Sequence, residues 1–187
     1  MTPAEYLELE EQTGERYDYH NGQAVARSQT ALPHNLIAAK LNQKIGTLIE
    51  GSGAEVLGSS QRIVVLATGL ETYPDVSVYC GHPHLAGANA LALANPVLLA
   101  EVLSPSTEAY DRGDKSAHYR RIESLQEYLL VAQDRVRVER YRRAGNNDWL
   151  LSEFTTLADS IPLASLAIDL PVAALYAGVP LEPGPRR

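Results

Sequence analysis

The sequence is poor in cysteine and in long apolar stretches, and both absences limit the classes of protein to which it can belong. Cys80 is the one cysteine among 187 residues, so no intrachain disulfide can form and a reducing compartment is expected. No apolar run approaches the roughly 20 residues that a membrane-spanning helix needs. The first residues are acidic and lack the apolar stretch of a secretory signal. We therefore expect a cytoplasmic protein that does not enter a membrane.

The sequence also lacks an excess of basic residues. Its 16 Lys and Arg stand against 23 Asp and Glu, which gives a formal net charge of −7. This balance is unusual for a nucleic-acid binder, because Lys and Arg at phosphates supply most non-specific affinity. Residues 112–143 nevertheless hold nine basic residues against five acidic ones. That segregation allows one basic face on an acidic body, and solvated arginines on exposed elements are an equally good interpretation.

Length and composition are those of one folded domain. A chain of 187 residues buries roughly two-thirds of its unfolded surface. A hydrophobic content of 45% with 21% charged residues is typical of a globular protein rather than a disordered one. We expect a single domain over residues 1–187, with a core over about residues 5–160. The Pro- and Gly-rich tail, about residues 178–187, is expected to be loose.

Hydrophobic periodicity predicts a mixture of helices and strands. A hairpin is expected at Asn21-Gly22, the strongest local turn signal, and residues 81–95 are expected to be irregular or a poorly specified helix. Helices are predicted over residues 2–13, 34–50 and 112–124, and strands over residues 74–80, 96–103, 127–132, 135–143 and 149–154. This order predicts an α/β (α+β) fold in which helices flank a mixed β-sheet.

Two carboxylates stand out by their surroundings. Glu101 lies in the most apolar stretch of the chain, where an ionised carboxylate needs a cation, a metal or dense hydrogen bonding. An ion pair with an arginine, or a strand end open to solvent, would also satisfy it. Asp75 follows Pro74 at the start of another apolar strand, and adjacent strand ends can bring two carboxylates together. Paired carboxylates suit Mg²⁺ or Mn²⁺, which prefer oxygen ligands.

The segment after Glu101 supplies a cation. Lys115 and Tyr119 are four residues apart on a predicted helix and so share one face, from which both can approach the carboxylates. An exposed surface lysine and a core tyrosine would give the same spacing. His82 and His84 are interpreted as loop residues, because no cysteine or histidine set with structural-zinc spacing accompanies them.

Several motifs together resemble the Uma2 family of restriction-endonuclease-like proteins. They occur in the family's order over roughly residues 5 to 160: Glu15-Arg16-Tyr17-Asp18-Tyr19-His20-Asn21-Gly22, His34-Asn35, Pro74-Asp75-Val76-Ser77-Val78, Glu101-Val102-Leu103-Ser104-Pro105-Ser106-Thr107, Tyr110-Asp111-Arg112-Gly113-Asp114-Lys115, Tyr119 and Tyr128-Leu129-Leu130-Val131.

The resemblance implies the PD-(D/E)XK nuclease fold, in which an Asp and a Glu bind metal and a lysine assists the attacking water. Here Asp75, Glu101 and the Val102 carbonyl would hold Mg²⁺ or Mn²⁺. The chain departs from the superfamily pattern because Leu103 stands where the lysine is expected. By resemblance to the family, Lys115 replaces it.

The resemblance also gives Tyr119 a place beside Lys115 in the catalytic group and makes Asp18 an accessory residue near the site. The expected function is metal-dependent hydrolysis of phosphodiester bonds, with nucleic acid, DNA above all, as the partner. A nuclease-fold binding module without cleavage and an enzyme for another phosphate ester are the alternatives. Because many nucleases of this fold pair up to meet two strands, a homodimer is expected.

Overall fold

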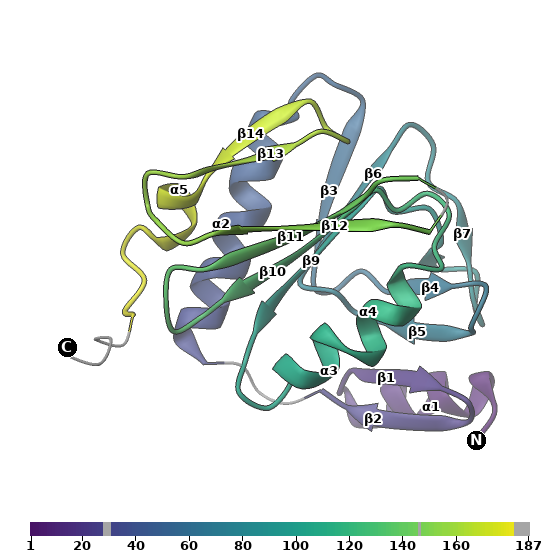
Figure 1. Cartoon of the computed structure of the whole chain (residues 1–187). Helices are drawn as coiled ribbons and strands as arrows, with labels where there is room; N and C mark the ends of the chain where they lie inside the picture. The colour runs from purple at the N-terminus through teal and green to yellow at the C-terminus, as the bar shows by residue number, and fades with distance from the viewer. Residues whose placement is uncertain (28–30, 146, 182–187) are drawn as a thin grey trace.

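The structure is a computed structural model and describes residues 1–27, 31–145 and 147–181. Its centre is a six-stranded sheet in the order β12-β11-β10-β9-β6-β3 (Figure 1). The strands are β3 (Ala54–Gly58), β6 (Val76–Cys80), β9 (Leu98–Leu103), β10 (Glu127–Ala132), β11 (Val138–Arg143) and β12 (Trp149–Phe154). Within it β9 and β10 are parallel, whereas the other neighbours are antiparallel. The predicted mixed sheet is confirmed.

A second sheet of shorter strands lies beside the first, in the order β2-β1-β5-β4-β8-β7. Its strands are β1 (Tyr17–His20), β2 (Gln23–Ala26), β4 (Ile63–Val65), β5 (Leu70–Thr72), β7 (Leu85–Ala86) and β8 (Ala92–Leu93). The last two come from residues 81–95, where a loop or poorly specified helix was expected. A separate hairpin pairs β13 (Ser160–Leu163) with β14 (Ile168–Pro171).

Helices cover both faces of the central sheet. The chain forms the helices α1 (Pro3–Thr13), α2 (Leu32–Leu48), α3 (Glu108–Arg112), α4 (Asp114–Tyr119) and α5 (Val172–Tyr176). Of these, α1 lies against β1 of the second sheet (Figure 1). Figure 1 places α2 behind the central sheet and the short α3 and α4 in front of it. The predicted helix over residues 112–124 is wrong in its bounds, because Gly113 separates α3 from α4 and α4 ends at Tyr119.

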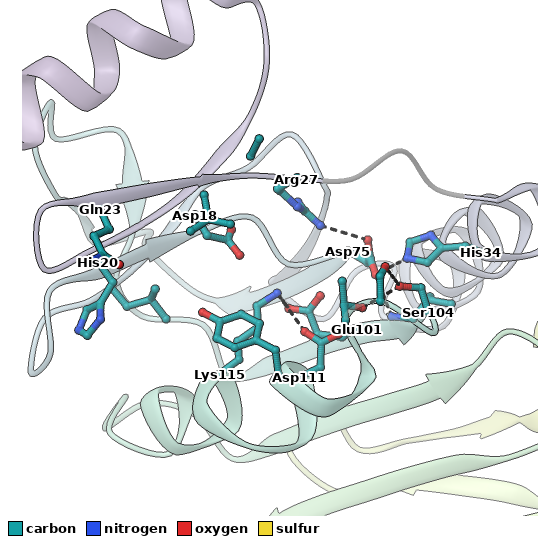
Figure 2. Close-up of a pocket in the computed structure, with 17 residues that line it drawn as sticks. Asp18, His20, Gln23, Arg27, His34, Asp75, Glu101, Ser104, Asp111 and Lys115 are labelled. Carbon is teal, nitrogen blue, oxygen red and sulfur yellow. Dashed lines mark hydrogen bonds and ion pairs between the residues drawn. The ribbon is translucent and has the colours of Figure 1, made fainter. Parts of the chain in front are cut away.

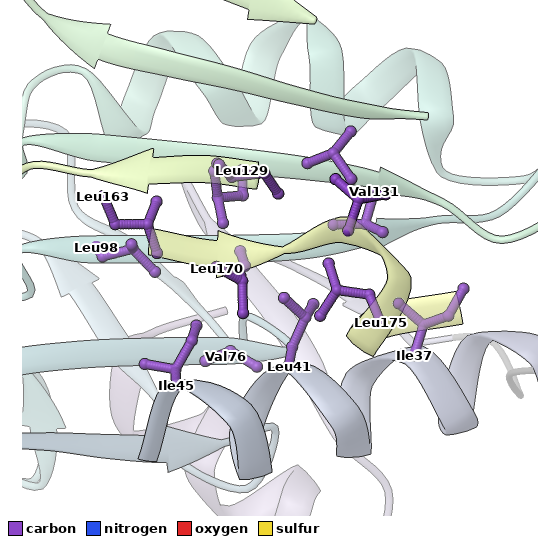
Figure 3. Close-up of a cluster of buried hydrophobic side chains, with 14 of the residues drawn as sticks. Ile37, Leu41, Ile45, Val76, Leu98, Leu129, Val131, Leu163, Leu170 and Leu175 are labelled. Atoms are coloured by element: carbon purple, nitrogen blue, oxygen red, sulfur yellow. The ribbon is translucent and has the colours of Figure 1, made fainter. Parts of the chain in front are cut away.

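Alternating residues of β9 face two different cores. Leu98, Ala100 and Val102 pack with α2 in one cluster, which β14 and α5 extend (Figure 3). Leu99 and Leu103 face the other way, into a cluster that includes residues of β4, β5 and α4. Since side chains alternate along a strand, Glu101 falls on the second face, beneath α3 and α4.

The C-terminal part of the chain contributes to the core beyond the expected limit at residue 160. Leu163, Leu170 and Leu175 are fully buried against α2 and the central sheet. Of the tail expected to be loose, Val179 is also buried, and residues 182–187 lie outside the described residues. Within the described parts of the chain, no helix is both long and apolar enough to cross a bilayer.

Candidate active site

The register of two antiparallel strands brings Asp75 and Glu101 together. Val76 of β6 lies opposite Ala100 of β9, so the residue before β6 comes level with the residue after Ala100. Both carboxylates line a cavity of about 510 Å³ and are only 5% and 2% exposed. Asp75 stands at the start of its strand as expected, whereas Glu101 lies within β9 rather than at its end.

Three groups hold the Asp75 carboxylate, two by hydrogen bonds and one by its charge. The Val102 main-chain N–H donates to Oδ2 at 2.8 Å, and the Nε2 of His34 lies 3.2 Å from the same oxygen. The Arg27 guanidinium is 3.8 Å from Oδ1 (Figure 2). Burial alone would raise the pKa of Asp75, but the hydrogen bond and charge of His34, the Val102 N–H and Arg27 together hold the pKa below its usual value. Asp75 is therefore a carboxylate at neutral pH.

Val102 presents its carbonyl on the same side as its N–H. In an extended strand the N–H and C=O of one residue point to the same neighbour. Because the Val102 N–H points to Asp75, its carbonyl oxygen also lies on the Asp75 side of β9. Val102 lines the cavity with the two carboxylates, so three oxygen donors face one space.

The Glu101 carboxylate is held at one oxygen. Tyr119 donates its hydroxyl to Oε1 at 2.7 Å, and the Lys115 Nζ lies 2.8 Å from the same atom. Burial raises the pKa of Glu101 to about 7; Lys115 opposes this rise, and the charges of Asp111 and Asp75 add to it. The ion pair considered from the sequence is therefore made with a lysine and not with an arginine. Both interactions are made with Oε1.

Lys115 reaches the site from the first turn of α4. Its side chain is buried, with Nζ 3.4 Å from Asp111 Oδ1 in addition to its contact with Glu101. Burial would lower the pKa of Lys115, but the carboxylates of Glu101, Asp18 and Asp111 outweigh burial and raise it above its usual value. The exposed surface lysine that the spacing also allowed is excluded, and the side chain is an ammonium within the cavity.

Tyr119 contacts Glu101 from the protein interior. It is fully buried among the apolar residues beneath α4, and its ring packs edge-on against Tyr128 at 5.2 Å between centroids. Its hydroxyl is not among the groups that line the cavity. The geometry makes Tyr119 a positioning residue for Glu101 rather than a group that touches a ligand.

The β1–β2 hairpin supplies the opposite wall of the cavity. Asp18 on β1 accepts a hydrogen bond from the Thr72 hydroxyl at 2.6 Å and faces the cavity, as does Arg27 just after β2. Figure 2 shows the two side chains across the cavity from Lys115 and Asp111. The accessory residue expected from the resemblance is thus part of the same lining.

Three residues of this lining had no role assigned from the sequence. His34, in the first turn of α2, and Arg27 both contact Asp75, although neither lies near it in the chain. Asp111 is buried beside Lys115. The spacing of four residues between Asp111 and Lys115 could have indicated their contact. No local pattern indicates the other two.

The donor set fits a hard divalent cation. Four carboxylates line the cavity against two permanent cations: Asp18, Asp75, Glu101 and Asp111 against Arg27 and Lys115. When all four carboxylates are ionised, two negative charges remain, which a divalent cation would balance. The described residues contain no group of three or more His, Cys, Asp or Glu placed to hold a metal. Mg²⁺ and Mn²⁺ can keep several waters beside one or two carboxylates, so two carboxylates and a carbonyl suit them better than zinc.

The histidines of residues 81–95 take no part in the site. His82 and His84 are exposed before β7, and the main chain of each contacts the side chain of Asn95. Their interpretation as loop residues agrees with this position.

Known proteins resemble this chain in fold and in sequence. A crystal structure of "a putative nuclease belonging to DUF820" from Anabaena variabilis has a TM-score of 0.75 and 20% identity, and covers 94% of this chain and 97% of that one. At this identity the match establishes the fold, which confirms the nuclease-like architecture expected from the motifs.

Two proteins of Synechocystis sp. match along most of their length. The uncharacterized protein slr1290 is 34% identical over 179 residues, covering 96% of this chain and 93% of the relative. The uncharacterized protein sll1609 is 35% identical over 153 residues, covering 82% and 86%. The family model described as "Putative restriction endonuclease" matches residues 3–173. The chain therefore belongs to the Uma2 family, which confirms the resemblance seen in its motifs.

Proposed function

We propose that this protein is a metal-dependent endonuclease that hydrolyses phosphodiester bonds in DNA. Family and fold make it a restriction-endonuclease-like nuclease, and the metal and the DNA substrate are the proposal. One observation carries it. Carboxylates from two strands, one main-chain carbonyl and one buried ammonium meet in a single cavity that keeps a net negative charge.

Asp75, Glu101 and the Val102 carbonyl are the groups that would hold Mg²⁺ or Mn²⁺. Such an ion, when bound, polarises a phosphate and lowers the pKa of a bound water. The chain itself fixes the ligands beforehand. His34, Arg27 and the Val102 N–H orient Asp75, and Tyr119 orients Glu101.

Lys115 acts as a fixed positive charge. Because its pKa is raised, it stays protonated and cannot take a proton from water. It can orient the attacking water and stabilise negative charge that develops on the phosphate in the transition state. This role would compensate for the leucine at position 103, where the superfamily pattern has a lysine, since the Lys115 ammonium reaches Glu101 from α4 instead of from β9.

The test is cleavage of plasmid DNA and of single-stranded DNA in Mg²⁺ or Mn²⁺. We expect cleavage, with Asp75→Asn and Glu101→Gln each lowering its rate by about 100-fold or more, the scale of losing one group that stabilises transition-state charge. Asp134→Asn is the control, because Asp134 is exposed and, among the described residues, forms an ion pair with its neighbour Arg135 alone. Equal rates in the wild type and both site variants would reject the assignment.

A nuclease-fold binding module is the main rival, and calorimetry separates the two. The nuclease proposal requires Mg²⁺ uptake that disappears in Glu101→Ala, whereas a binding module need not bind the ion. Hydrolysis of another phosphate ester at the same site would keep the metal but leave DNA intact. The homodimer and the cytoplasmic location stay predictions, the first of them open to sedimentation analysis.

A further inference from the structure

A second hollow of about 360 Å³ adjoins the cavity of the carboxylates. His20 and Tyr110 line both spaces, so the two hollows are neighbours on either side of these residues. Each volume is within the range of about 300 to 1,000 Å³ that small-ligand pockets occupy. A chain-like ligand that occupies the first cavity and passes His20 and Tyr110 would therefore meet the second hollow.

Several of the side chains that line the second hollow are planar rings. Tyr110 is 37% exposed at the boundary, which leaves part of an aromatic ring open to a ligand. The rings of His20 and His118 meet edge-on at 4.5 Å between centroids, and His118 Nδ1 lies 2.9 Å from the Thr68 hydroxyl. Exposed aromatic and imidazole rings are surfaces on which an unpaired nucleobase stacks.

The basic residues of residues 112–143 are mostly engaged within the protein. Arg112 and Arg137 form ion pairs with Glu139. Arg140 and Arg143 donate to main-chain carbonyls. Arg121 is exposed, and within the described residues its guanidinium makes no hydrogen bond or ion pair; the residue lines the second hollow.

The second hollow is nearly neutral, since Asp114 lies in it with Arg121. A phosphate alone would gain little binding free energy here, because the charges of Asp114 and Arg121 nearly cancel. A base gains more, because a guanidinium plane stacks on it and a carboxylate accepts from its amino groups. The composition thus favours a base over a phosphate.

Burial of the catalytic groups restricts the form of the strand that reaches them. Asp75, Glu101 and Lys115 are each at most 5% exposed and lie between the β1–β2 hairpin and α3 (Figure 2). A phosphodiester must pass between these walls. A base still paired to a second strand would meet them, so the nucleotide must be unpaired or extruded from the duplex.

We infer that the substrate is single-stranded DNA, with the base beside the scissile phosphate stacked on Tyr110 in the second hollow. This inference rests on the proposed nuclease function for its scissile phosphate. Binding of the strand can be measured without cleavage, so the two can fail separately.

The test is fluorescence anisotropy of a labelled single strand about 12 nucleotides long, within the site sizes of single-strand binders. EDTA is present so that no divalent cation supports cleavage. We expect the single strand to bind more tightly than the same strand annealed to its complement. Tyr110→Ala should weaken binding about 10-fold, and Tyr110→Phe, which keeps the ring, less than about 2-fold.

Arg121→Ala should also weaken binding, by about 5-fold, whereas Arg142→Ala is the matched control. Within the described residues the Arg142 guanidinium makes no hydrogen bond or ion pair, and Arg142 lines neither hollow, so Arg142→Ala removes a charge that is distant from the proposed strand. Equal affinity for duplex and single strand, or full binding by Tyr110→Ala, would overturn the inference. Ring-dependent binding without any cleavage in metal would support it while rejecting the proposed catalysis.

Discussion

At the scale of the residue, the Glu101 carboxylate gives the stability of the metal-free protein a dependence on pH. Its folded-state pKa of about 7 lies above its unfolded value of 4.5. The folded state therefore binds the proton more tightly, and its contribution to the free energy of unfolding is complete below about pH 4.5. That contribution is lost as pH rises through about 7.

We expect the wild type in EDTA to lose stability between about pH 5 and pH 8, and the Glu101→Gln variant to lose much less. Urea unfolding at both pH values measures the difference. Asp134→Asn is the control, because Asp134 is exposed, pairs with its neighbour Arg135 and does not line the cavity of Glu101. A wild type and a Glu101→Gln variant with equal pH slopes would contradict the assignment.

Tyr119 allows the positioning of Glu101 to be tested alone. Tyr119→Phe keeps the ring in the core and removes the hydroxyl that donates to Glu101 at 2.7 Å. We expect roughly a 10-fold loss of cleavage rate, a higher Mg²⁺ concentration for half-maximal rate, and about 1 kcal/mol less stability.

Tyr128→Phe is the matched control for Tyr119→Phe. The Tyr128 hydroxyl is equally buried but donates to the Asp111 main-chain carbonyl at 3.2 Å. Its loss should cost similar stability and leave the Mg²⁺ dependence unchanged. If both variants shift the Mg²⁺ requirement alike, the role of Tyr119 is structural only.

The sequence was more informative about some site residues than about others. Glu101 stands out because a charge inside an apolar strand needs a partner, and Asp75 because it opens a second strand. Lys115 required family resemblance, since its helix position alone also fitted a surface lysine. His34 and Arg27 meet Asp75 only through the tertiary fold, so no spacing along the chain predicts them.

At the scale of the element, the β1–β2 hairpin places Asp18 and Arg27 and depends on a left-handed turn. Asn21 and Gly22 have φ of 48° and 77°. A Cβ on Gly22 would also lie 3.3 Å from the Met1 carbonyl oxygen. We expect Gly22→Ala to cost about 1 kcal/mol of stability, measured by urea unfolding.

Gly58→Ala on β3 is the control for the turn. Its added Cβ would meet Asn42 Nδ2 at an ordinary 3.6 Å, and no left-handed φ is involved. We expect a change well under that of Gly22→Ala. Equal costs at the two positions would show that the left-handed turn is not what makes Gly22 sensitive.

Element prediction failed where local periodicity and tertiary pairing disagree. The helix expected over residues 112–124 is broken at Gly113, where a Cβ would lie 3.0 Å from the Ala109 carbonyl oxygen. The short strands β7 and β8 pair within residues 81–95, a segment whose composition is typical of a loop. Strands of two residues leave no period for a sequence pattern to detect.

At the scale of the whole molecule, the acidic chain has few cations to offer a nucleic acid. Arg27, Lys115 and Arg121 are the described Lys and Arg residues that line either hollow. Even if each of the three neutralised one phosphate of a single strand, at a slope of about −0.7 for each, the log of the affinity should fall against log salt with a slope no steeper than about −2.

Anisotropy titrations between about 50 and 200 mM NaCl measure this slope. A slope far steeper than −2 would indicate an extended basic face, the alternative that the clustering of basic residues in the sequence left open. The internal ion pairs of Arg112 and Arg137 argue against such a face.

The second sheet, which joins β1 to β5 and β4 to β8, was not predicted, because these pairings connect distant segments.

The arrival of Lys115 from α4 has a consequence for how such proteins diverge. Lys115 and Glu101 lie on separate elements, 14 positions apart in the sequence. Only the positions of their charged groups in space are constrained. Mutation can therefore move the basic group along the chain while the trio of charges offered to a substrate stays intact. A sequence motif that requires lysine two positions after the glutamate would miss this chain and others built in the same way.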